Sequence, residues 1–221
     1  MKKKIAIFAG ILFFCASCSK LDVVGSGSVV SFEKLLNDKN VFVGENEKNE
    51  SWILFSSDSG AKFVLNKNYD KNSKYDVALE FDAKPFLDAG LDVKKLPEYF
   101  TADDEKISVG AKFWNQEFQY DKEISLLETY KYVVKNNRDA IGYHAALDHY
   151  GINLGNGNLF EWAKDLNTND KDIVFALEIE PLAKAGVNLS AVAGWTLAKV
   201  PVDDENGKPI VVDKLLKVFN L

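Results

Sequence analysis

The stretch ALEFDAKPFLDAGLDV, residues 78–93, has a counterpart in ALEIEPLAKAGVNL, residues 176–189. In each copy an apolar strand pattern leads to a proline and then to a glycine, Gly90 or Gly186. Proline is favoured at the start of a helix, and glycine is favoured just past its end. Each copy therefore predicts a strand followed by a short helix.

The similarity continues beyond the two glycines. Asp103-Asp104-Glu105 in the first copy is matched by Asp203-Asp204-Glu205 in the second, and each copy then reaches an Asp-Lys pair before a helical pattern. We therefore predict an α+β fold, with a mostly antiparallel sheet, packed helices and an internal duplication of a strand-helix-hairpin-helix unit. The alternative is chance similarity among common cap and turn residues.

Other segments support a sheet with a few helices. Residues 75–82 alternate between apolar and polar side chains, which is typical of a half-buried strand. Residues 52–55 and 61–65 are joined through Gly60 and predict a β-hairpin. From about Asp121 the apolar residues follow a helical spacing. We expect one domain over residues 29–221, with similar halves at about 75–134 and 172–221.

The segment between the halves, RDAIGYHAALDHYGINLGNGNLFEWAKD (residues 138–165), contains both histidines and the only arginine. We predict a helix from Arg138 to Gly151, because glycine commonly follows a helix end. A second helix is predicted from Asn158, which forms a capping-box pattern with Glu161. The two halves would thus be joined by a central helical segment.

This central segment supplies the candidate site residues. On a helix His144 and Asp148 would share one face and could form an acid–base pair, while His149 would point elsewhere. The alternative is histidines packed in or beside the core. We expect no metal site, because three ligands do not converge in this segment. We also expect no cofactor, because the glycine loop of residues 154–158 lacks the fingerprint of a nucleotide-binding loop.

Binding candidates come from the same segment, because junctions between repeats are common places for pockets. They are Arg138, whose planar guanidinium differs from every other basic side chain of the protein, and the aromatic residues Tyr143 and Trp162. Spread aromatic residues are also ordinary core residues, which is the alternative for Trp162.

The N-terminus has the pattern of an export signal, with lysines at positions 2–4 followed by an apolar run over residues 5–14. That run is shorter than the roughly 20 residues that a membrane-spanning helix needs. The segment Cys15-Ala16-Ser17-Cys18 resembles a bacterial lipobox. The resemblance implies a signal peptide over residues 1–17 and a lipid on Cys18, with residues 18–28 as a flexible tether that includes a Gly-Ser run.

Composition and net charge indicate the class of protein and exclude some partners. The chain has 221 residues, of which 47% are hydrophobic, and a formal net charge of -6. This composition indicates a globular protein, and the acidic balance argues against nucleic acid as a partner. We expect an extracytoplasmic lipoprotein of the bacterial cell envelope, attached to the membrane through its N-terminal lipid.

Two function hypotheses follow from these observations. The first is a non-catalytic binding or interaction module whose small-molecule or protein ligand is unknown. The alternative is an extracytoplasmic hydrolase that uses His144 or His149 together with Asp148. The sequence has no Gly-x-Ser-x-Gly elbow, so it gives no support for a serine hydrolase.

Overall fold

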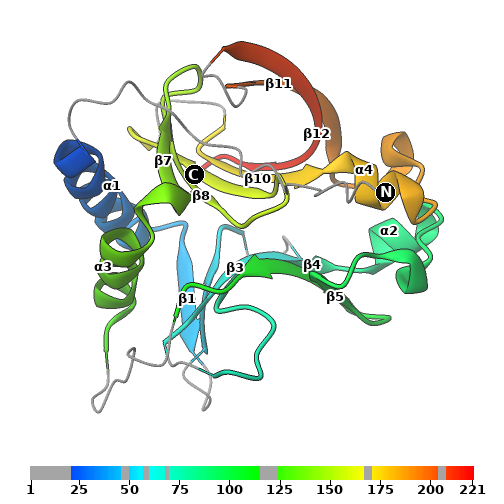
Figure 1. Ribbon diagram of the computed structural model, residues 1–221, viewed down its shortest axis with the longest axis horizontal. Helices are drawn as coiled ribbons and strands as arrows, with labels where there is room; N and C mark the ends of the chain where they lie inside the picture. Colours follow the sequence, from blue (N-terminus) through cyan, green and yellow to red (C-terminus); the bar gives the residue numbers. More distant parts are fainter. Residues whose placement is uncertain are drawn as a thin grey trace, which may run out of the picture.

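The structure is a computed structural model that describes residues 21–45, 50–56, 60–67, 70–114, 124–166, 171–203 and 208–221. Two six-stranded antiparallel sheets form most of it (Figure 1). The predicted α+β class with packed helices is therefore wrong, and the protein is mostly β. Cys18 and the rest of the N-terminal signal lie outside the described residues.

The first sheet has the strand order β1-β2-β3-β4-β6-β5. Its strands are β1 (Phe42–Glu45), β2 (Glu50–Leu54), β3 (Ala61–Asn66), β4 (Val77–Asp82), β5 (Phe100–Ala102) and β6 (Lys106–Ala111). The predicted hairpin is present as β2 and β3, and Gly60 has the positive φ of 57° that the turn required.

The second sheet has the order β7-β8-β9-β10-β12-β11, which repeats the order of the first. Its strands are β7 (Ile141–His144), β8 (His149–Asn153), β9 (Leu159–Ala163), β10 (Ile173–Glu178), β11 (Thr196–Asp203) and β12 (Pro209–Phe219). β12 bends strongly in Figure 1. Leu159, Val174 and Val200 belong to a small apolar cluster that is separate from the main core.

Short helical elements connect and flank the sheets. They are α1 (Leu21–Leu36), α2 (Lys84–Asp88), η1 (Val93–Lys95), α3 (Leu126–Asn136), η2 (Arg138–Ala140), α4 (Ile179–Lys184) and η3 (Leu189–Ala191). Both predicted Pro-started helices are present, as α2 and α4. Within the described residues, no helix combines the length and the apolar character needed to cross a membrane.

The main core lies between the two sheets and is rich in aromatic rings. Phe63 of β3 stacks on Phe160 of β9 with ring centroids 4.1 Å apart. Phe55 and Phe175 add an edge-to-face contact at 5.8 Å. Aromatic pairs in these arrangements contribute beyond their buried area, so the sheets are held together by ring contacts as well as by general apolar burial.

The predicted tether of residues 18–28 is corrected in its described part, because α1 begins at Leu21 and contains the whole Gly-Ser run. Tertiary packing explains why a run suited to a flexible linker is helical. A Cβ added to Gly27 would lie 2.4 Å from the hydroxyl of Tyr150, and Ser28 is fully buried. Small residues therefore let α1 approach the second sheet closely, which outweighs their weak helix propensity.

The predicted central helices are also wrong. Residues 141–153 form the β7–β8 hairpin, and residues 159–163 form β9. All five residues of β8 and all five of β9 are buried, so the sequence lacked the alternation that marks a strand with one exposed face. The helix spacing of His144 and Asp148 was therefore coincidental.

The strand-helix-hairpin-helix duplication is corrected for a similar reason. The helical pattern expected at the pair Asp213-Lys214 is instead part of the long strand β12. The buried residues Lys214, Leu215 and Leu216 are consecutive, so both faces of the strand are covered. A strand covered on both faces produces an apolar run that periodicity cannot distinguish from a helix.

Candidate functional site

His144 and His149 lie opposite each other in the β7–β8 ladder, and both contact a carboxylate of the next strand. Nδ1 of His144 is 3.0 Å from Oε1 of Glu161, and Nδ1 of His149 is 3.9 Å from Oε2 of the same residue. Gly151 makes this possible, because a Cβ at that position would be 3.2 Å from Cγ of Glu161. The structure thus joins the two histidines through a carboxylate that the sequence predicted as part of a helix cap.

The histidine cluster is closed to solvent. His144 is 7% exposed, His149 is 2% exposed and Glu161 is 1% exposed. Burial lowers the pKa of His149, and its Nδ1 has no hydrogen-bond partner among the described residues. A buried imidazole without a good partner is more stable in its neutral form.

Asp148 does not complete the predicted acid–base pair. Its carboxylate accepts a hydrogen bond from the hydroxyl of Tyr143. Consecutive residues of a strand point to opposite faces, so Tyr143 and His144 lie on opposite sides of β7. The hydrogen bond to Asp148 is the main cause that raises the pKa of Tyr143 to about 12.

The predicted binding residues do not converge on one place. Trp162 is fully buried, and its Nε1 donates to Ser31 Oγ of α1 at 3.1 Å. Arg138 is exposed in η2. Tyr143 is half-buried beside Asp148. Trp162 acts as a core residue, which was the alternative reading of its sequence position.

No group of three or more His, Cys, Asp or Glu side chains suited to a metal ion occurs in the part of the chain that the structure describes. Another buried charged group belongs to an ion pair: Lys214 Nζ lies 2.6 Å from Glu178 Oε2 and donates to the carbonyl oxygen of Gly157 at 2.8 Å. Its three polar groups satisfy one another, so it fits a structural role.

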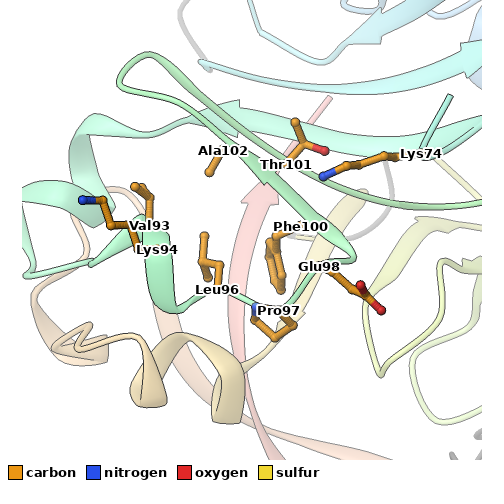
Figure 2. Close-up of a pocket in the computed structure, with 9 residues that line it drawn as sticks. All are labelled: Lys74, Val93, Lys94, Leu96, Pro97, Glu98, Phe100, Thr101 and Ala102. Carbon is orange, nitrogen blue, oxygen red and sulfur yellow. The ribbon is translucent and has the colours of Figure 1, made fainter. Parts of the chain in front are cut away.

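A pocket of about 390 Å³ opens beside the edge strand β5 (Figure 2), and neither histidine belongs to its lining. This volume falls within the range of about 300–1,000 Å³ typical of ligand sites. It is lined by Lys74, Val93, Lys94, Leu96, Pro97, Glu98, Phe100, Thr101 and Ala102.

Local structure explains how this pocket forms. Asp92 caps η1 by accepting from the backbone N–H of Lys94 at 3.1 Å, and a tight turn follows in which Phe100 N donates to Pro97 O at 2.9 Å. The cap and the turn place Leu96 and Pro97 beside β5 with their apolar atoms partly exposed.

The sequence contained only a weak cue to this pocket. Lys94 and Lys95 precede Leu96-Pro97, and such a lysine pair occurs on many protein surfaces. Glu161 was likewise missed as a partner of the histidines, because its position opposite Gly151 follows from strand pairing and not from sequence spacing.

Comparisons of the chain with protein-family models, with curated proteins and with solved structures found no match.

Proposed function

We propose that this chain is an extracytoplasmic lipoprotein, held to the membrane of a bacterial cell envelope by a lipid on Cys18, whose β-sheet domain is a non-catalytic binding module. The observation that carries the binding role is the pocket beside β5. It combines apolar side chains with exposed charged groups, the composition that binds a ligand and also fixes its orientation.

The proposal of a non-catalytic domain is based on the burial of the two histidines and on their absence from the pocket lining. A general acid or base must come within hydrogen-bond reach of the substrate proton, about 2.6–3.2 Å between heavy atoms. His144 and His149 are buried, and the pocket lining contains neither of them. The lining includes Glu98 and two lysines, which suit recognition of a polar ligand.

A ligand screen tests the binding role. The detergent-solubilised protein is screened by thermal unfolding against sugars, lipids, peptides and small carboxylates, because a ligand that binds only the folded state raises the unfolding midpoint. Truncating the pocket with Leu96→Ala should reduce that stabilisation. Leu127→Ala, which truncates a half-buried leucine of α3, is the matched control and should leave it unchanged. A ligand whose stabilisation survives Leu96→Ala and is lost in His144→Gln would contradict the assignment.

A hydrolase is the second candidate, and one observation favours it. A carboxylate that contacts Nδ1 of an imidazole can orient the ring for acid–base chemistry, and Glu161 has this relationship to His144 at 3.0 Å. The test is turnover of chromogenic ester, peptide and glycoside substrates. Hydrolysis that is lost in both His144→Gln and Glu161→Gln, with Leu96→Ala unaffected, would favour the hydrolase over the binding module.

The anchor has its own test, with a matched control in the same segment. Cys18→Ala should abolish incorporation of labelled palmitate and partitioning into the detergent phase, because the lipidated cysteine is lost. Cys15→Ala leaves Cys18 in place and should still be labelled. Equal labelling of both variants would contradict the assignment of the lipid to Cys18.

A further inference from the structure

β5 is the end strand of the first sheet, and part of its backbone is directed away from the sheet. Asp103 N donates to Lys106 O at 3.0 Å, and Thr101 pairs with Ser108. Because the groups of successive residues in an antiparallel ladder alternate in direction, the N–H and C=O of Ala102 point away from β6. A free strand edge of this kind can pair with another extended chain.

The pocket lies along this free edge and has an apolar lining. Leu96, Pro97 and Ala102 are half-buried, and Phe100 is buried with its ring beside them (Figure 2). An extended chain that pairs with an edge strand directs alternate side chains to one side, where a pocket can receive them. The strand edge and the pocket therefore suit the same ligand, a peptide in extended conformation.

Charge identifies the side chains that such a peptide would carry. Lys74 and Lys94 are exposed on opposite sides of the pocket (Figure 2), and neither forms an ion pair with another described residue. The neighbouring Lys95, by contrast, pairs with Asp92 at 3.3 Å. Two ammonium groups against the single carboxylate of Glu98 leave a locally positive rim on a protein whose net charge is -6.

We propose that β5 pairs with an extended acidic segment of a partner protein, whose carboxylates contact Lys74 and Lys94 and whose apolar side chain enters the pocket over Leu96 and Phe100. This deepens the proposed binding function and rests on it. Main-chain hydrogen bonds to Ala102 supply affinity, and the two lysines select acidic sequences and speed association.

The edge strand β11 of the second sheet lacks this combination. β11 contains Pro201, which has no N–H to donate. The described pocket includes no residue of β11. Of these two edge strands, β5 is therefore the one with both an outward-directed backbone and a described pocket beside it.

The test uses a fluorescein-labelled peptide of alternating valine and aspartate with blocked ends, titrated into the detergent-solubilised protein. Fluorescence polarisation should show saturable binding that weakens as salt is raised. The same peptide with lysine in place of aspartate should bind roughly tenfold more weakly or not at all, since like charges then meet. A peptide with N-methylated backbone amides should also lose binding, because it cannot donate to the strand edge.

Protein variants test separately how the backbone hydrogen bonds and the lysine charges contribute to peptide binding. Ala102→Pro removes the outward N–H while leaving the Thr101–Ser108 pairing available, and it should abolish peptide binding. Lys74→Glu with Lys94→Glu should lower affinity roughly tenfold. Lys84→Glu is the matched control, since Lys84 is an exposed lysine whose ion pair with Asp88 lies on α2, and it should not change affinity.

Two outcomes would overturn the proposal. One is equal affinity for the acidic, the basic and the N-methylated peptides, and this arm uses the parent protein, so it does not depend on any variant folding. The other is full binding to a folded Ala102→Pro protein. A non-peptide ligand whose stabilisation is reduced by Leu96→Ala would contradict the peptide while leaving the binding function in place, so the two failures are distinguishable.

Discussion

Gly90 and Gly186 meet face to face, each against the backbone of the other. A Cβ added to Gly90 would lie 2.9 Å from the carbonyl oxygen of Gly186, and a Cβ added to Gly186 would lie 2.9 Å from the carbonyl oxygen of Gly90. Both have positive φ, 100° and 97°. Asp92 N donates to Ala185 O and Asn188 N donates to Ala89 O, each at 2.8 Å, so the contact joins the segments that follow α2 and α4.

This contact predicts a large loss of stability in Gly90→Ala. The substitution adds left-handed backbone strain of roughly 1–2 kcal/mol and a steric conflict with a main-chain atom that costs about 1–3 kcal/mol more. Gly155→Ala is the matched control, because Gly155 has φ of 80° but a Cβ there would meet nothing within 4 Å. Gly155→Ala should therefore lose only the stability that the backbone strain costs. Urea unfolding of both variants measures the difference, and equal losses would contradict the close contact.

The buried side chain of His149 predicts a loss of stability in acid. Burial lowers the pKa of His149 in the folded protein below its usual 6.5, so the unfolded chain binds more protons between the two values. Stability should therefore be complete above about pH 6.5 and should fall as pH decreases toward the folded pKa, by at most about 1.4 kcal/mol per pH unit for one proton.

His149→Gln removes this titration and is the variant to compare. Its free energy of unfolding, measured by urea denaturation between neutral and mildly acidic pH, should vary less than that of the parent. A parent and variant with parallel pH profiles would show that another group causes the acid sensitivity.

The ion pair of Lys214 and Glu178 predicts that removing the carboxylate lowers the stability of the protein more than removing the ammonium group. Lys214 is 1% exposed, so removal of its carboxylate leaves a buried cation. Glu178→Ala should cost about 1–3 kcal/mol, the penalty for an unsatisfied buried group, reduced here because Glu178 is itself partly exposed. Lys214→Met, which keeps the volume and removes the charge, should cost less.

Thermal or urea unfolding of the two single variants and of the double variant checks this asymmetry. In the Lys214→Met background, Glu178→Ala should have little further effect, since no cation then needs the carboxylate. Additive losses would mean that the two side chains act independently.

Local sequence signals were sufficient where an element has polar–apolar alternation or characteristic turn and cap residues. The β2–β3 hairpin, the alternating strand β4 and the short helices between Pro85 and Gly90 and between Pro181 and Gly186 were all predicted from such signals. In each case periodicity or a conformational requirement of glycine and proline is a property of the chain itself.

Burial on both faces removed the same signals from β8, β9 and the inner part of β12. There, an apolar run or a helix-like spacing was compatible with either structure, and only pairing with neighbouring strands selected the extended one. That pairing also placed Glu161 between His144 and His149 and set Leu96 beside the free edge of β5. The sequence by itself indicated that the segment with both histidines was worth testing. The burial of the histidines and the position of the pocket were decided by contacts between segments that are distant in the chain.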